Sequence, residues 1–71
     1  MKYVVIYERA ADGGWGAYPP DLPGVGIVAR TKEQARESIR KAIAMHVECV
    51  REQGGLLPES DPVDAEVIDV A

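Results

Sequence analysis

The chain has 71 residues, a single cysteine and a formal net charge of −4 at pH 7. One cysteine excludes an intrachain disulfide and a cysteine-rich zinc site, and the acidic balance argues against unaided binding to nucleic acid, which requires clustered lysine and arginine. A chain of this size buries only about 60–65% of its extended surface, so its core is marginal and self-association is a common remedy.

Neither a targeting segment nor a membrane span is recognisable in the sequence. The chain begins at Met1 without a basic stretch followed by an apolar one, and no apolar run approaches the roughly 20 residues of a membrane helix. We therefore expect one domain over residues 1–71, located in the cytoplasm and without membrane contact. The acidic charge suits a basic protein partner, although simple solubility is the favoured explanation of it.

The first predicted element is a strand over about residues 2–8. Residues 3–7 read Tyr-Val-Val-Ile-Tyr, and such β-branched and aromatic residues, apolar on both faces, are typical of a central strand. A glycine-containing turn follows at residues 10–14. Residues 15–18 and 25–30 are predicted as the second and third strands, and the short links between the three predict an antiparallel meander.

The link between the second and third strands contains three prolines. Residues 19–24 read Pro-Pro-Asp-Leu-Pro-Gly. Ordinary hairpin loops have about two to five residues and are built from Gly, Asn or Asp, whereas this corner is longer, stiff and partly apolar. It is either a structural brace or a surface that meets a partner.

A long helix is predicted over about residues 32–53. Thr31 and Gln34 form a capping-box pattern, and Gly54-Gly55 supplies the stop signal. Apolar residues recur at spacings of three and four along one stripe: Ala35, Ile39, Ala42, Ile43, Val47 and Val50. Met45 and Cys49 add a second apolar flank in the distal half, which suggests a partner helix or a second subunit.

A last strand is predicted over about residues 65–70, where Val67, Ile68 and Val70 supply the apolar content. The order is then β-β-β-α-β. This order predicts an α+β fold in which one long helix packs on one face of a small, mostly antiparallel sheet.

Catalytic and metal chemistry find little support in the sequence. His46 and Cys49 lie three residues apart on the predicted helix, where a regular helix offers no evident oxyanion hole. His46 is therefore interpreted as a packing or surface residue, and Cys49 as a buried, inert thiol. A two-metal nuclease needs carboxylates that converge on a central strand. Glu8, Asp12 and Asp21 lie at a strand end or in turns, so we expect no catalytic, cofactor-binding or metal-binding residue.

Several of these pieces occur together in a known family. They are the apolar first strand, the sequence Gly-Trp-Gly-Ala-Tyr at 14–18, the Pro-Asp-Leu-Pro-Gly corner at 20–24, the Thr-x-Glu-x-Ala helix start at 31–35, Ala42-Ile43, and Gly-Gly-Leu-Leu-Pro at 54–58. In this order they resemble the HicB-type antitoxin domain of toxin–antitoxin systems, over nearly the whole chain. The resemblance implies a partial RNase H-like fold without a working nuclease centre.

The resemblance also implies a function and a partner. The chain is expected to bind and neutralise a small basic HicA-type toxin, an mRNA-cleaving ribonuclease, by masking its active face. Family members commonly carry a C-terminal DNA-binding segment, which these 71 residues lack, so we expect no direct nucleic-acid binding by this chain alone. A homo-oligomer, dimer or tetramer, is expected from the small core and the two-flanked helix.

The residues expected to contact or support contact with the partner lie in and beside the proline corner: Trp15, Tyr18, Pro20, Asp21, Leu22 and Pro23. Aromatic residues are frequent in interface hot spots, although core packing is the leading interpretation of Trp15. Two other functions stay open at this point. They are an inactive orphan oligomeric module and a metal-dependent nuclease of RNase H type.

Overall fold

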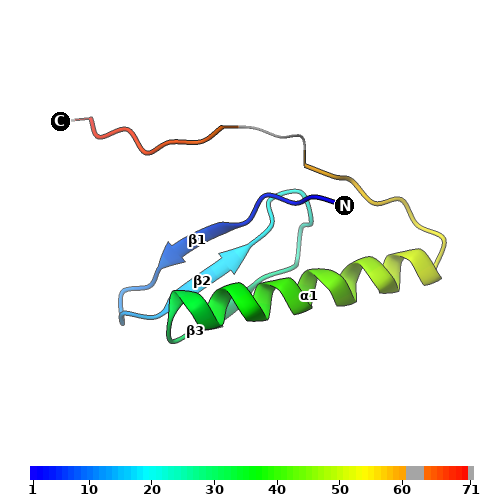
Figure 1. Cartoon of the computed structure of the whole chain (residues 1–71), viewed down its shortest axis with the longest axis horizontal. Helices are drawn as coiled ribbons and strands as arrows, with labels where there is room; N and C mark the ends of the chain where they lie inside the picture. The colour runs from blue at the N-terminus through cyan, green and yellow to red at the C-terminus, as the bar shows by residue number, and fades with distance from the viewer. Residues whose placement is uncertain (61–63, 71) are drawn as a thin grey trace.

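A computed structural model of the protein describes residues 1–60 and 64–70. It consists of a three-stranded sheet and one long helix, in the order β1 (Ile6–Arg9), β2 (Trp15–Tyr18), β3 (Ile27–Ala29) and α1 (Lys32–Glu52) (Figure 1). Both strand pairs are antiparallel and the sheet order is β1-β2-β3. The predicted meander followed by a helix is confirmed.

The turn between β1 and β2 forms through its own backbone and one carboxylate. The Ala10 amide donates to the Gly14 carbonyl at 2.8 Å, and the Gly14 amide donates to the Asp12 side chain at 2.9 Å. Gly13 adopts a φ of +90°, a region that residues with a Cβ rarely enter. The Asp-Gly pair therefore sets the register in which Arg9 faces Trp15.

The proline corner folds back on itself between β2 and β3. The Leu22 amide donates to the Pro19 carbonyl at 3.1 Å, and the Val25 amide donates to the Leu22 carbonyl at 3.2 Å. Gly24 takes a φ of +89°. Pro19 and Leu22 are buried, so the inner side of the corner belongs to the interior of the domain.

Capping interactions define both ends of the helix, at Thr31 and at Gln53. The Thr31 side chain accepts a hydrogen bond from the Gln34 amide at 3.1 Å, as the capping-box pattern predicts. At the other end Gly54 has a φ of +71°, and the Gly55 amide donates to the Val50 carbonyl at 2.9 Å. No helix among the residues that the structure describes is both long and apolar enough to cross a membrane.

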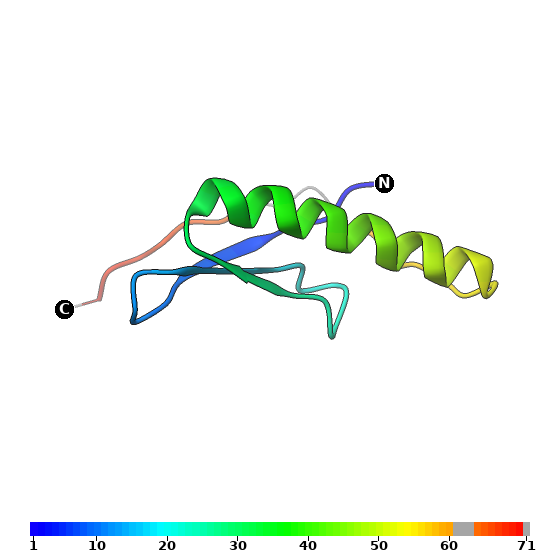
Figure 2. The same cartoon turned by 90° about the horizontal axis from the view of Figure 1, so that it is seen from below.

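The core lies between the helix and one face of the sheet. Ala17 from β2 and Ala35 and Ile39 from α1 form its buried centre. Half-buried neighbours complete it: Val5, Tyr7, Trp15, Val25, Ile27, Ala29, Ala42 and Ile43. The helix lies across β2 and β3, and its distal half extends past the end of the sheet (Figures 1 and 2).

The predicted last strand over 65–70 is wrong for this chain taken alone. Residues 64–70 are extended but form no strand, because no neighbouring strand hydrogen-bonds to them. The first strand also differs from its prediction over 2–8. It begins at Ile6, because its neighbour β2 ends at Tyr18 and is followed by Pro19 and Pro20, which have no amide to donate. It also lies at the edge of the sheet instead of its centre.

Smaller boundary shifts affect the other elements. The third strand, predicted over 25–30, is limited to Ile27–Ala29, since Val25 still bonds to the corner. The helix, predicted over 32–53, ends at Glu52, because Gln53 already serves as its C-cap. The second strand has the predicted bounds.

Candidate partner-binding surface

One face of the sheet carries no other described element. In Figure 2 the helix runs along one side of the sheet and leaves the opposite side uncovered. Because side chains alternate along each strand, this uncovered side carries Ile6 and Glu8 from β1, Tyr18 from β2 and Val28 from β3. We call these four residues the open face.

The open face is apolar and flat. Val28 is 86% exposed, and Ile6 and Tyr18 are each more than one third exposed. Ile6 lies directly opposite Tyr18, while Gly16 lies between Glu8 and Val28. The missing side chain at Gly16, and at Gly26 beside Tyr18, leaves a shallow hollow across the strands.

A single carboxylate borders this apolar surface. The Tyr18 hydroxyl donates to Glu8 Oε1 at 3.4 Å, a long hydrogen bond that holds the ring over the sheet. Glu8 therefore gives the open face a negative charge beside its aromatic side chain. Such a combination suits a partner that presents an apolar patch next to a cation.

Of the six residues predicted to contact a partner, Tyr18 lies on the open face and Trp15 does not. Trp15 points to the helix side, where it joins the half-buried border of the core. The Arg9 guanidinium lies 5.3 Å from the centre of its ring, and the Lys32 ammonium lies 5.8 Å away. These cation–π contacts, one from the end of β1 and one from the start of α1, favour this position of the ring.

The four predicted residues of the proline corner divide between interior and surface. Leu22 is only 2% exposed and is a core residue, whereas Pro20 and Pro23 are exposed at the tip. The Asp21 carboxylate accepts a hydrogen bond from the Ser60 hydroxyl, which itself accepts one from the Val4 amide at 2.9 Å. The corner therefore braces the N-terminal strand against the segment that follows the helix.

Sequence reasoning missed Ile6, Glu8 and Val28. The alternation of side chains along β1 and β3 groups these residues by sheet face. It shows which group is exposed only when the strand register is known, together with the face of the sheet that the helix covers. The glycines at 16 and 26 are the second signal, since small residues on one face of two adjacent strands leave a flat surface.

Within the part of the chain that the structure describes, histidine, cysteine and carboxylate side chains do not form a metal-binding cluster. Among residues 1–60 and 64–70, no three His, Cys, Asp or Glu side chains are placed to hold a metal ion. Cys49, predicted to be buried, is exposed, because it lies on the distal half of α1, which extends past the end of the sheet. Asp12 bonds to the turn before β2, and Asp21 bonds to Ser60. The acids considered for a nuclease centre thus have structural partners at separate places.

Comparisons with known proteins agree with the fold and point to one family. A family model described as the HicB-like antitoxin of bacterial toxin–antitoxin systems matches residues 3–70. A UPF0150 protein of Thermoplasma acidophilum is 31% identical over 61 residues, which cover 86% of this chain and 88% of that protein. A UPF0150 protein of Synechocystis is 34% identical over 65 residues, covering 92% of this chain and 75% of that protein.

A solved structure has the same architecture. The crystal structure of the N-terminal domain of the Burkholderia pseudomallei antitoxin HicB superposes with a TM-score of 0.77 at 27% identity. The match covers 89% of this chain and 74% of that one.

Proposed function

This chain belongs to the HicB-like antitoxin family of bacterial toxin–antitoxin systems, and on that basis we propose that it neutralises a toxin by binding it through the open face. The partner is a small, basic, mRNA-cleaving toxin of HicA type. The antitoxin acts in the cytoplasm by occluding the toxin's active surface, without catalysis of its own.

The observation that carries this proposal is the exposure of Val28. A β-branched side chain in the middle of a strand normally packs against a second layer, yet Val28, in the middle of the edge strand β3, is 86% exposed. Burying such a side chain against a partner contributes about 1.5–3 kcal/mol, which corresponds to roughly ten- to hundredfold in affinity. The rigid sheet also lowers the entropy lost on binding, since its backbone is already ordered.

Charge favours the same kind of partner. The chain carries a net charge of −4, and Glu8 borders the apolar part of the open face. Opposite fields accelerate the encounter with a basic protein and disfavour acidic competitors. Family membership supports a toxin as the partner, and the negative charge of this chain supports a partner with a positive net charge.

A pair of matched variants tests the proposal. Val28→Lys and Met45→Lys each add one ammonium group in place of an exposed apolar side chain, the first on the open face and the second on the distal part of α1. Each is co-expressed with the small basic protein encoded next to the antitoxin gene. We expect Val28→Lys to lose growth rescue and co-purification, while Met45→Lys retains both.

Circular dichroism of both variants, taken first, establishes that each is folded. A folded Val28→Lys protein that still rescues growth and binds with unchanged affinity contradicts the proposed face. Failure of the unaltered chain to bind the neighbouring protein contradicts the HicA-type partner itself.

A further inference from the structure

Two glycines beside each other on the open face are not required by the fold. A Cβ at Gly16 would meet only the Ile27 carbonyl oxygen, at 3.7 Å, and a Cβ at Gly26 would meet nothing closer than the Ala17 carbonyl oxygen, at 3.6 Å. Both distances are ordinary van der Waals contacts, and neither glycine has a positive φ. Alanine would fit at both positions and would lose less conformational entropy on folding than glycine does. The glycines therefore leave space that the fold does not need.

This space is a hollow whose walls differ in chemistry. Glu8 and Val28 lie on either side of Gly16, and Tyr18 borders the hollow next to Gly26. The strand β2 pairs with β1 on one side and with β3 on the other, so the peptide groups of the floor are already hydrogen-bonded. The floor is therefore a flat stacking surface without free acceptors. We call these five residues the glycine hollow.

The carboxylate of Glu8 is available to a cation from outside the chain. Among the described residues that line the glycine hollow, Glu8 is the only charged one, and its side chain is exposed. It accepts the long bond from the Tyr18 hydroxyl through Oε1, and it forms no ion pair within residues 1–60 and 64–70. Its neighbour Arg9 points to the other face, where its guanidinium lies against the Trp15 ring.

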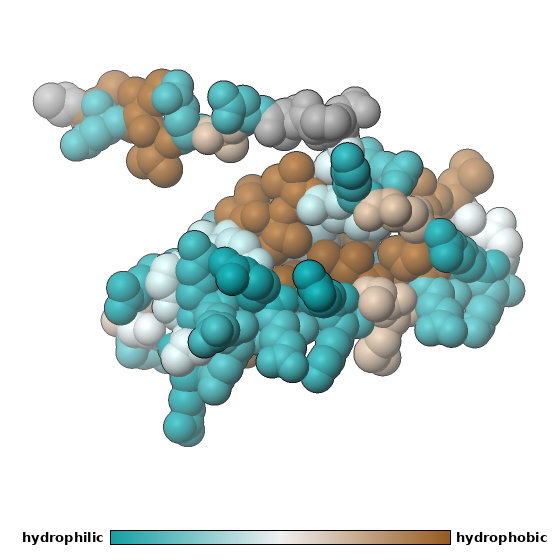
Figure 3. All heavy atoms as spheres, in the orientation of Figure 1, coloured by the Kyte–Doolittle hydropathy of each residue, from teal (hydrophilic) through white to brown (hydrophobic). Residues whose placement is uncertain are grey.

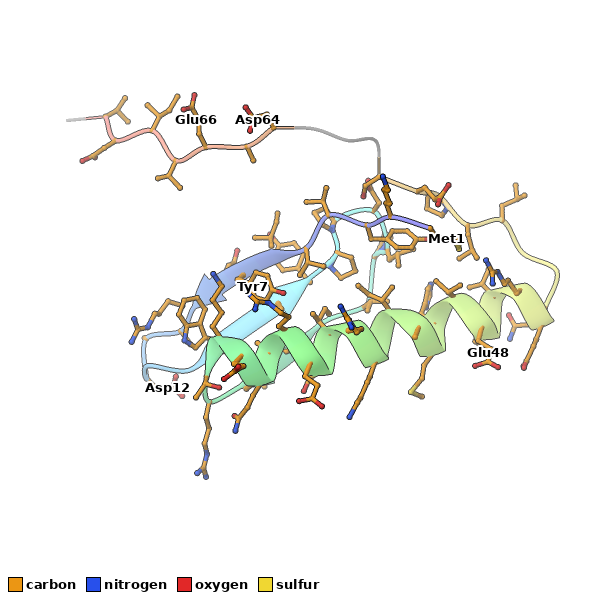
Figure 4. All side chains as sticks on the ribbon, viewed as in Figure 1. Met1, Tyr7, Asp12, Glu48, Asp64 and Glu66 are labelled. Atoms are coloured by element: carbon orange, nitrogen blue, oxygen red, sulfur yellow. The ribbon has the colours of Figure 1, made fainter. Side chains whose placement is uncertain are left out.

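The glycine hollow lies on the side of the molecule away from the helix. In Figure 4 the labelled Tyr7 lies between β1 and α1, so the next residue, Glu8, projects from the opposite face of the sheet. Figure 3 shows the helix side, where hydrophilic side chains predominate over the N-terminal half of α1. The hollow and this hydrophilic surface therefore lie on opposite sides of the molecule.

The walls of the glycine hollow match the side chain of arginine. A guanidinium group is planar and weakly hydrated, stacks on aromatic rings, and carries its donors in a fork that fits a carboxylate. Tyr18 supplies the ring, Glu8 supplies the carboxylate, and Val28 supplies an apolar surface for the methylene stem. A lysine ammonium is a compact, strongly hydrated charge, and the paired floor offers no acceptors to replace its water. The hollow therefore distinguishes between the two cations.

We infer that the glycine hollow receives an arginine side chain of the basic partner. The inference rests on the proposed function and names the group of the partner that the open face recognises. The guanidinium lies over Gly16, stacks against the Tyr18 ring and bonds to Glu8, while its stem packs against Val28. A side chain at Gly16 or Gly26 would fill the space that this group occupies.

Two peptides of equal charge, hexa-arginine and hexa-lysine, test the inference without the toxin. Each is added to the isotope-labelled chain, and the amide signals of Gly16 and Gly26 are followed by NMR. We expect hexa-arginine to shift both signals and to bind at this site about two- to fivefold more tightly than hexa-lysine, because only the guanidinium stacks on Tyr18. Equal affinities of the two peptides, or shifts that spare both glycines, overturn the inference.

Filling the glycine hollow provides a second readout. Gly16→Ala and Gly16→Val place progressively larger side chains on its floor. We expect the unfolding temperature of both variants to stay the same or rise, since both residues suit a strand better than glycine, while the affinity for hexa-arginine falls with size. A folded Gly16→Val chain that binds hexa-arginine as tightly as the unaltered chain contradicts the inference. A lower unfolding temperature in both variants contradicts the claim that the fold does not need this glycine.

Removal of the wall carboxylate completes the test. Glu8→Gln is expected to weaken binding of hexa-arginine at the glycine hollow by about two- to fivefold, the range for an exposed ion pair. Glu48→Gln, which removes an equal charge from α1, is the matched control and should leave binding at this site unchanged. Equal effects of the two substitutions overturn the role of Glu8.

The outcome is separable from that of the proposed function. No toxin enters these measurements, so a failure of arginine selectivity leaves toxin neutralisation through the open face untouched. Conversely, selective binding of hexa-arginine by a chain that does not bind the neighbouring basic protein would remove the proposed toxin partner and leave the arginine site in place.

Discussion

At the scale of single residues, Ser60 joins three parts of the chain that are distant in sequence. Its amide donates to the Lys2 carbonyl, and its hydroxyl links the Val4 amide to the Asp21 carboxylate. We expect Asp21→Ala to lower the free energy of unfolding by about 1 kcal/mol, and Ser60→Ala by about 1–2 kcal/mol because it removes two side-chain bonds. Urea denaturation monitored by circular dichroism measures both.

A double-mutant cycle serves as the control for this link. Because Asp21 acts through Ser60, the double variant should be no less stable than Ser60→Ala alone. Additive losses from the two substitutions would show that Asp21 contributes through some other contact.

The same residue shows how far the sequence predicted the candidate site. The composition of the corner indicated a rigid structure, and Asp21 was interpreted as a turn residue, a contact or both. Its partner Ser60 lies 39 positions away, and no local pattern connects the two. Tyr18, predicted as a contact residue, lies on the open face. Val28 could not be identified from the sequence, because its exposure depends on where the helix packs.

At the scale of elements, the start of α1 is fixed by one side chain. The Thr31 hydroxyl satisfies the Gln34 amide, one of the free donors of the first helical turn. We expect Thr31→Ala to lower the free energy of unfolding by about 1 kcal/mol, while Thr31→Ser, which keeps the hydroxyl, changes it little. Thermal or urea unfolding compares the two, and equal stability of both variants contradicts the role of the cap.

Elements with local signals were predicted well, and the one that depends on a distant partner was not. The helix has a cap, a repeating apolar stripe and a glycine stop, and β2 lies between two turns with recognisable chemistry. Residues 65–70 have the composition of a strand, but a strand also needs a neighbour, and neighbours are set by tertiary or quaternary contacts. The edge position of β1 could not be read from its sequence for the same reason.

At the scale of the whole molecule, the net charge of −4 is expected to speed association with the basic toxin proposed as partner. We expect the association rate to fall about tenfold or more as salt rises from low to high concentration, because screening shortens the reach of the field. The dissociation rate should change less. Stopped-flow mixing with the neighbouring basic protein measures both rates.

Two isosteric variants localise this effect. Glu8→Gln removes a charge from the open face, and Glu48→Gln removes one from the exposed surface of α1. Both change the net charge from −4 to −3. A weaker dependence of the association rate on salt in Glu8→Gln than in Glu48→Gln therefore supports binding at the open face. An association rate that does not respond to salt contradicts steering by charge.

The bonds of Ser60 to Lys2 and Val4 also bear on the order in which the parts of the chain fold. They close a loop of more than fifty residues, which corresponds to roughly 3.5 kcal/mol of closure entropy. The hairpin and the helix form through contacts that are local in sequence, whereas these bonds join residues 56 or more positions apart, so the N-terminal residues are expected to be among the last to be secured on folding. A chain cut before this serine lacks both bonds, and its first residues are then left unattached.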